Sequence, residues 1–481
     1  MIDDNPFYDK KALAKNFFWL AVLFVVCKFT GGAAFVVLIP ITLVFIVQAR
    51  NTALLAVLFV ASSAMTMNPF FMPHTVLFVA SQKVLMLMAA SFLALQVFGR
   101  RHSALITPLL SIFPYLIYMV FVSQGGWMPA ISNLKLFLFT MIYFALYGCA
   151  VRVMDDRCDE RKVRTMVLVL GIFYIFGSLA LIPFPGISYM SSDELLKDPT
   201  AISLFKGTTN HSQALGPTVA MFGVMLFADL VFSIQRSEPL YMALLTVAPY
   251  LLYRTSSRTA LGSFAAGMAF VTFLAMNGSG VVKTKWRRAM TNFMLMIAVL
   301  GSISISVVPP LRDKATRFLL KSYSGETVVS MEVIMASRSR IYESTLENWR
   351  RKPIVGNGFQ VSDEMEGMQI NGVRDMLSAP VEKCTWLYAI LEEGGVIGMI
   401  LFVLFLLISI GLMVKRRAFI GASMLFTFIM VNLGEFGIFS MSAGGGLYWC
   451  MVFVGVILDH KRQIAAKRRD EEAFARALAF V

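Results

Sequence analysis

The sequence predicts an all-α polytopic integral membrane protein with one large polar loop outside the membrane. Hydrophobic residues make up 57% of the chain and charged residues only 15%, and the mean hydropathy is +0.70. Apolar runs close to the roughly 20 residues of a membrane-spanning helix recur along nearly the whole chain. A single long polar segment, 309–385, separates two of these runs. This combination excludes an ordinary soluble domain.

The apolar runs predict about 12–14 membrane-spanning helices. Residues 1–308 are expected to form an N-terminal bundle of about 11 spans, followed by the large loop 309–385, further spans in 386–458 and a basic tail, 459–481. We expect the tail to be a short basic helix that binds a lipid surface. The runs are Phe17–Phe29, Gly31–Gln48, Thr52–Met67, Val76–Phe98, Ala104–Ser123, Met128–Val151, Thr165–Phe184, Gly207–Ile234, Leu240–Tyr253, Thr259–Met276, Ala289–Val308, Trp386–Val414, Ala418–Phe436 and Met441–Leu458.

Clusters of Lys and Arg in the short connections predict the orientation. They fall on one side of the membrane when the spans alternate, and Lys and Arg concentrate on the cytoplasmic side. Both termini are therefore expected inside and the large loop outside. The net charge of +14 is explained by orientation and by anionic lipid rather than by nucleic acid. The clusters are Arg100–Arg101, Arg157–Arg164, Lys283–Arg288, Lys415–Arg417 and Lys461–Arg469.

Cysteine and histidine usage indicates neither a disulfide framework nor a metal centre. The five cysteines are scattered without a CxxC pair, and the four histidines are not paired at ligand spacing. The sequence therefore predicts no metal and no cofactor.

The central part of the large loop, Ala336–Phe359, predicts an amphipathic helix followed by a tight turn. Pro353 ends the helix, and Gly356 and Gly358 form the turn. A long, structured loop is usually functional, although a solvated cap that closes a helix bundle is the alternative. One side of the helix carries Ile341, Tyr342, Thr345 and Trp349, and another carries Arg340, Glu343 and Glu347.

Polar residues gather at the outer ends of several predicted spans. The string Phe205–Ser212 opens one span, Arg254–Thr259 opens another, Val381–Thr385 opens a third, and Gly434 with Glu435 closes a fourth. Ionisable groups at such positions are costly and usually face a cavity or a partner. The same face is expected to hold Lys83 and Lys135, which lie within or beside apolar spans.

These residues differ in what they indicate. Arg254 can be explained by a side chain that extends to the membrane surface. Arg258 lies among the hydroxyls of Ser256, Ser257 and Thr259, which suit an oxyanion. His211, between Asn210 and Ser212, is either a packed histidine or a substrate contact.

An outward-facing site rich in Arg and Lys suits phosphate, because the planar guanidinium binds phosphate in a bidentate manner. A phosphate ligand at a membrane is a lipid phosphate or pyrophosphate. The chain has no Walker loop and no DxD-type nucleotide motif, which disfavours cytosolic nucleotide chemistry.

Three strings resemble motifs of O-antigen ligases and Wzy-type polysaccharide polymerases. SRSRIYESTLENWRRKPIVGNGF resembles their Arg helix before a P-h-h-G-x-G turn (h apolar), SSRTALGSFAAG their SRTAhh motif, and KGTTNHSQALGP, more loosely, a third motif at the start of a span. The similarity covers about Phe205–Phe439. It implies the metal-independent membrane glycosyltransferase fold of the C type. It also implies transfer of a glycan from an undecaprenyl-diphosphate donor to an acceptor hydroxyl at the periplasmic face.

The resemblance also implies roles for individual residues. Arg258 matches the Arg of the SR motif, and Arg340, with Arg338 as the alternative, matches the Arg of the loop helix. Both would bind the diphosphate leaving group. Arg254, close to Arg258 in the sequence, is a further candidate for binding the diphosphate. His211, Asn210, Glu435 and Lys83 are candidate substrate contacts.

The chain departs from the family at one position. Many members have H-N-x-x-L-x-x-L-x-E-x-G-x-x-G after the large loop, with His as the proposed base, and an alignment on Glu393, Gly395 and Gly398 puts Cys384 at the His position. Glu382 then becomes the candidate base. Lys383 either holds the diphosphate or acts as a base if burial lowers its pKa.

We therefore expect an inner-membrane, Wzy-type polymerase of undecaprenyl-diphosphate-linked repeat units for an exported polysaccharide. The alternatives are an O-antigen ligase and, from another class, a flippase or transporter of lipid-linked sugars. The implied partners are the lipid-linked glycan donor, the glycan acceptor, membrane lipid and further polysaccharide assembly and export proteins, with no nucleic acid.

Overall fold

The computed structural model describes residues 7–31, 33–97, 103–155, 160–190, 204–235, 237–278, 282–286, 292, 339–362, 383, 385–434, 437–440 and 444–478. Within these ranges the chain is helical, and β-structure is limited to two isolated antiparallel bridges, Met67 with Thr209 and Tyr189 with Phe205. The predicted all-α class is confirmed.

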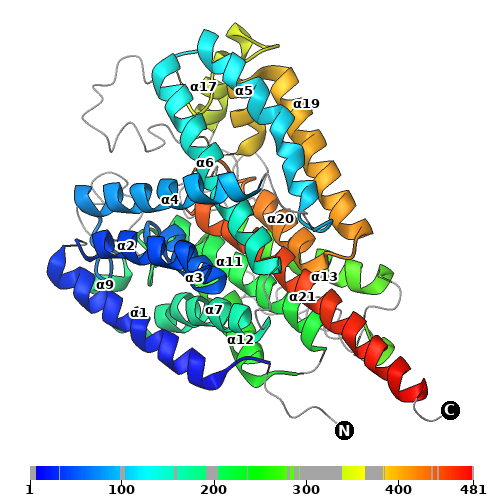
Figure 1. The fold of residues 1–481 in the computed structure, drawn as a ribbon. Coiled ribbons are helices and arrows are strands. Elements are labelled where there is room, and N and C mark those ends of the chain that lie inside the picture. Colours follow the sequence, from blue (N-terminus) through cyan, green and yellow to red (C-terminus); the bar gives the residue numbers. More distant parts are fainter. Residues whose placement is uncertain are drawn as a thin grey trace, which may run out of the picture.

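The helices follow the predicted apolar runs closely (Figure 1). Short 3-10 or π-helical turns, Thr107–Ile112, Phe173–Gly177 and Leu230–Ile234, extend three of them. The helices are α1 (Lys10–Thr30), α2 (Ala34–Val47), α3 (Asn51–Ala64), α4 (Val76–Val97), α5 (Phe113–Gly125), α6 (Pro129–Asp155), α7 (Glu160–Ile172), α8 (Ser178–Ala180), α9 (Pro185–Ser188), α11 (Ser212–Asp229), α12 (Pro239–Arg254), α13 (Arg258–Asn277), α17 (Ser339–Arg351), α19 (Trp386–Lys415), α20 (Phe419–Val431) and α21 (Gly445–Leu478).

Among the described residues, eight helical segments are long and apolar enough to cross a membrane. Several other predicted spans are shorter: α2 and α3 have 14 residues each and α20 has 13. At 1.5 Å per residue, a 14-residue helix measures about 21 Å, less than the roughly 30 Å hydrocarbon core. The predicted span Ala289–Val308 lies outside the described residues except for position 292. The protein is thus multi-pass, with helices of unequal length.

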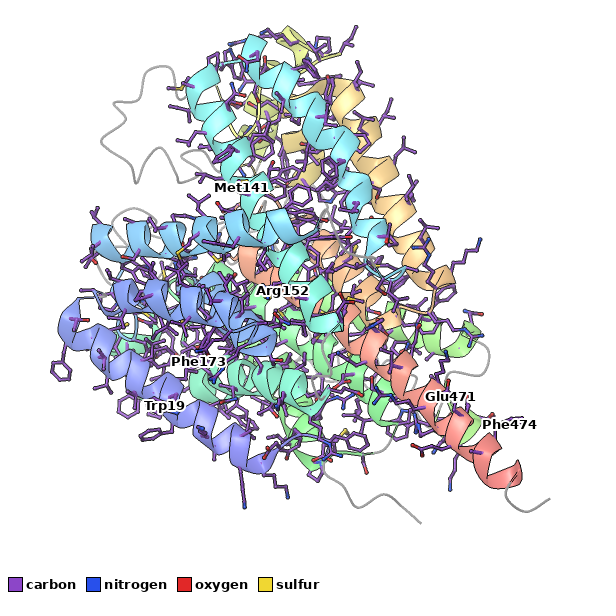
Figure 2. All side chains as sticks on the ribbon, viewed as in Figure 1. Trp19, Met141, Arg152, Phe173, Glu471 and Phe474 are labelled. Carbon is purple, nitrogen blue, oxygen red and sulfur yellow. The ribbon has the colours of Figure 1, made fainter. Side chains whose placement is uncertain are left out.

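Helix α11 occupies the centre of the bundle and α1 its edge. In the most apolar stretch of Ser212–Ile234, which joins α11 to the π-helical turn after it, 94% of the residues are buried, whereas in that of α1 only 11% are. Figure 2 shows Trp19 of α1 directed away from the other helices. Close packing around α11 depends on small residues, because a Cβ on Gly267 of α13 would lie 2.7 Å from Val224 of α11.

Buried ion pairs connect the helices at the end of the bundle that contains the predicted cytoplasmic loops. Arg164 Nε donates to Asp229 Oδ2 at 2.8 Å, and the Tyr241 hydroxyl donates to the same oxygen at 2.8 Å. Asp459 Oδ2 accepts from the Gly421 amide at 2.9 Å, in the first turn of α20. A buried carboxylate needs such donors, so these contacts fasten α7, α11 and α12 to one another and α20 to α21 at this end.

The start of α1 and the end of α21 lie at the bottom of Figure 1, and α17 lies at the top beside α5, α6 and α19. The tail is helical as predicted, but it continues α21 unbroken from Gly445 to Leu478. No Gly or Pro interrupts residues 459–478, so nothing in the sequence ends the helix there. Figure 2 shows Glu471 and Phe474 on this free end, away from the other helices.

Candidate functional site

The predicted turn after α17 docks onto a break in membrane helix α19. Gly356 and Gly358 have φ of 82° and 119°, values that favour glycine. The Asn357 amide donates to the carbonyl of Glu392 at 2.9 Å, and the Gly358 amide donates to the carbonyl of Glu393 at 3.0 Å. In the opposite sense, the Val396 amide donates to the Pro353 carbonyl at 2.9 Å. The loop and α19 thus satisfy each other's main-chain groups where the helix is interrupted.

Gly395 makes the break in α19 possible. Its φ of 62° and ψ of −164° are non-helical and essentially restricted to glycine. A Cβ at Gly395 would lie 2.3 Å from the Ile354 carbonyl oxygen, and a Cβ at Gly356 would lie 2.4 Å from the Glu393 carbonyl oxygen. Glycine is therefore required at positions 356 and 395, because the backbones of the loop and of α19 approach each other too closely for a side chain.

A buried charge cluster, consisting of Lys383, Glu392 and Glu393, lies directly beside this contact. Lys383 Nζ is 2.9 Å from Glu392 Oε2 and 3.0 Å from Glu393 Oε1. It also donates to the Val361 carbonyl at 2.9 Å. The three side chains are at most 6% exposed. The ammonium group of Lys383, which lies just before α19, therefore connects the loop at Val361 to Glu392 and Glu393 of α19.

Two further polar side chains extend the charge cluster. Asn348 of α17 donates through Nδ2 to Glu392 Oε1 at 3.0 Å. Lys135 of α6 donates through Nζ to the Gln360 carbonyl at 3.0 Å and is also buried. With two lysines and two glutamates, the group is formally neutral, which lowers the cost of holding these charges away from water.

The pKa of Lys383 is raised above its ordinary value. Burial lowers it, but attraction to Glu392 and Glu393 and the hydrogen bonds to them outweigh that effect. The base role considered for Lys383 required a pKa lowered by burial, and that condition is not met. The raised pKa favours the cationic form of Lys383 beside Glu392 and Glu393.

Aromatic side chains pack close to this region. The ring of Phe439 lies 5.1 Å from that of Phe359 and 5.4 Å from that of Tyr115. Trp386, at the start of α19, packs against Phe402 at 5.7 Å. Such packing excludes water and strengthens electrostatic interactions nearby.

The two other motif segments begin neighbouring helices. His211 is the N-cap of α11, where its Nδ1 accepts from the Gln213 amide at 3.1 Å, and Arg258 is the first residue of α13 after the N-cap Ser257. A Cβ on Gly216 would lie 2.8 Å from Ser257 Cβ, so the two helix starts are in close contact.

The segment after α20 links these helix starts to α19. A Cβ on Gly434 would lie 2.0 Å from Thr259 Oγ1, and the Trp386 amide donates to the Asn432 carbonyl at 3.0 Å. The starts of α11, α13 and α19 are therefore connected by a continuous series of contacts. His211, Arg258 and Lys383 lie at or next to these three helix starts.

Three other predicted site residues have structural contacts. Asn210 Nδ2 donates to the Met65 carbonyl at 3.0 Å. Arg254 hydrogen-bonds the Tyr189 hydroxyl, and its guanidinium lies 5.9 Å from the ring centres of Tyr189 and Phe205. Lys83 is buried within α4.

Glu382, Arg338 and Glu435 lie outside the described residues, as does Cys384. Arg340 lies in the first turn of α17, and only its backbone is described. The predicted helix is present as α17, and of the four residues placed on one side of it, Thr345 is buried.

Sequence reasoning missed Glu392 as a site residue and used Glu393 only to align a motif. The available signal was two adjacent carboxylates in a 30-residue helix that is otherwise strongly apolar. Asn348 was also missed, because an amide on an amphipathic helix does not stand out. Within the described part of the chain, no group of three or more His, Cys, Asp or Glu side chains could hold a metal ion.

No protein-family model matches the chain, and no curated protein matches it in sequence.

Proposed function

We propose that the protein is a membrane glycosyltransferase that polymerises undecaprenyl-diphosphate-linked repeat units of an exported polysaccharide at the periplasmic face of a bacterial inner membrane. The observation that carries the proposal is the contact between segments that resemble family motifs. The segment with His211 starts α11, the segment with Arg258 starts α13, and these starts touch. The P-h-h-G-x-G turn docks on the E-x-G break of α19.

The chemistry of this region favours an anionic leaving group. Helix N-termini carry partial positive charge and bind phosphate, and α11 and α13 both begin here. Arg258 and Arg340, with Arg338 as the alternative, would neutralise the diphosphate as the glycosidic bond breaks. Glu382 is the candidate base for the acceptor hydroxyl, in a single displacement that inverts the sugar carbon.

A ligase that transfers finished glycan to a lipid acceptor is the second candidate within the same chemistry. The Cys at position 384, where ligase-like members have His, favours the polymerase.

A flippase for lipid-linked sugars is the candidate from another class. The charge cluster and the starts of α11 and α13 form one contact network, whereas a flippase needs polar groups along a path through both leaflets.

Deletion of the gene, followed by analysis of the accumulated glycan, tests the proposal. Single repeat units on undecaprenyl diphosphate at the outer face support a polymerase, full polymers on the lipid carrier indicate a ligase, and units retained at the inner face indicate a flippase. Complementation with the parent chain is the positive control, and Arg258→Ala at matched protein level is the test of the site. Glycan that is unchanged by deletion would refute all three functions.

A further inference from the structure

We propose that the charge cluster of Lys383, Glu392 and Glu393, together with Asn348, fastens loop helix α17 to membrane helix α19, and that Lys383 is a positioning residue rather than a group that reacts with or binds the substrate. The proposal concerns contacts of the chain with itself. Only its consequence for glycan transfer rests on the proposed function.

Oxygen atoms of the chain itself surround the ammonium group of Lys383. Glu392 Oε2 and the Val361 carbonyl oxygen each lie 2.9 Å from Nζ, and Glu393 Oε1 lies at 3.0 Å. Nζ donates hydrogen bonds to the Val361 carbonyl and to Glu393 Oε1 and forms an ion pair with Glu392 Oε2, so three oxygen atoms of the chain surround the ammonium group. The side chain is 6% exposed, so a substrate would have to displace a carboxylate to reach it.

The same contacts join parts of the chain that are distant in sequence. Asn348 lies on α17 and donates to Glu392, which lies on α19 and pairs with Lys383. Tyr342 of α17 packs on Tyr388 of α19, with ring centres 4.9 Å apart. Asn357 contacts both helices, because its main-chain amide donates to the Glu392 carbonyl at 2.9 Å and its side-chain Nδ2 donates to the Asn348 carbonyl at 2.9 Å. The charge cluster therefore lies at the contact that holds α17 against α19.

The position of α17 matters because it carries Arg340. Asn348 follows Arg340 by eight residues, or about 12 Å along a helix. A loss of the Asn348 contact would tilt or release the helix and displace Arg340 from a diphosphate. Such displacements of about an ångström can cost a hundredfold in rate.

Charge compensation distinguishes fastening from direct action on the substrate. Removal of Lys383 alone leaves two adjacent buried carboxylates without their cation, which is strongly destabilising. Replacement of the whole buried group by neutral side chains of similar shape is often tolerated. A reacting or phosphate-binding lysine cannot be replaced in this way.

The experiment compares Lys383→Met, the triple variant Lys383→Met/Glu392→Gln/Glu393→Gln and the parent, purified as full chains in detergent. Glu347→Gln, an exposed carboxylate on α17, is the matched control. The first readout is the rate of tryptic cleavage after Arg350 and Arg351, followed by mass spectrometry. The second is glycan transfer at matched protein level.

We expect Lys383→Met to raise the cleavage rate at least about tenfold and to lower transfer by a similar factor, and the triple variant to return both to within about threefold of the parent. If Lys383→Met fails to accumulate but the triple variant accumulates, removal of the two glutamate charges has compensated for the loss of the lysine charge, which also supports the fastening role. Cleavage unchanged by Lys383→Met would overturn the fastening role. If the triple variant is cleaved at the parental rate but does not recover glycan transfer, Lys383 acts directly on the substrate. The cleavage rate does not depend on the reaction that the protein catalyses. It therefore tests the fastening role even if the proposed function is wrong.

Discussion

The main-chain amide of Gly358 lies 3.0 Å from the carbonyl oxygen of Glu393, although the two residues belong to a polar loop and a membrane helix. Glu393 has a free carbonyl because Gly395, two residues later, leaves the helical conformation. The loop supplies the donor that the broken helix lacks. Tyr118 reinforces the contact, since its hydroxyl lies 3.0 Å from the carbonyl oxygens of both Val355 and Gly394 and shares its single proton between them. Two glycine motifs that are separate in sequence thus form one structural unit.

We expect Gly395→Ala to destabilise the protein by about 2 kcal/mol or more, because the backbone conformation is strained for any residue with a Cβ. The added carbon would also collide with the Ile354 carbonyl, 2.3 Å away. Gly411→Ala is the matched control: it lies in the same helix, and a Cβ there would meet nothing within 4 Å. Thermal unfolding in detergent measures both variants. Equal melting temperatures would show that the break in α19 tolerates a side chain.

We expect Arg258→Ala and Arg340→Ala each to lose most glycan transfer while the protein still accumulates. Removal of one charged donor to a transition-state oxyanion costs on the order of 3 kcal/mol, or about a hundredfold in rate. Lys replacements should rescue poorly, because the planar fork of the guanidinium is lost. Arg350→Ala, an exposed arginine on α17, is the control. Near-parental activity of Arg340→Ala would make the loop helix a cap of the bundle.

We expect reporter fusions to place Glu326–Met376 in the periplasm and Arg161, Arg287 and the tail in the cytoplasm. The expectation rests on the alternating Lys and Arg clusters. The arrangement of the helices agrees with it, because α1 begins and α21 ends opposite α17 (Figure 1). Alkaline phosphatase active in the loop and green fluorescence at the tail are the expected signals. Cytoplasmic reporter activity within the loop would remove the basis for every site residue proposed above.

Much of the fold could be predicted because its signals are local. Apolar run length located most helices, and Pro353 with Gly356 and Gly358 located the end of α17 and its turn. The break in α19 was not predicted, because Gly395 is followed by an apolar run typical of an uninterrupted span. The conformation at Gly395 becomes favourable only once a loop residue about 40 positions earlier, Ile354, lies against it.

The candidate site was predicted less completely, for the same physical reason. Residue type indicated Arg258 and His211, but pairing depends on tertiary contacts. Lys383 could be singled out as an unusual lysine, and nothing in the sequence showed that Glu392 and Glu393 would surround it. A buried charge is defined by its partner, and the partner was ten residues further along the chain.

The final prediction concerns Cys384, which lies where the O-antigen ligase motif that the sequence resembles has histidine. We expect Cys384→Ser to retain activity, because a single displacement needs a base and a stabilised leaving group but no covalent glycosyl-enzyme. Thiol chemistry also requires a setting that stabilises the thiolate. Lys383, the adjacent cation, is already paired with Glu392 and Glu393, so its charge is largely neutralised.

In the same assay, Glu382→Gln and Lys383→Ala should both lose activity, for different reasons. Glu382→Gln removes the candidate base and should leave protein stability near that of the parent. Lys383→Ala leaves two buried carboxylates unpaired, so its loss of activity should be accompanied by a lower melting temperature. Polymer synthesis and thermal unfolding are measured for each variant at matched protein levels, with Cys384→Ser as the reference for substitution at this segment. An inactive Cys384→Ser beside an active Glu382→Gln would reverse the assignment, because the thiol and not the carboxylate would then carry the reaction.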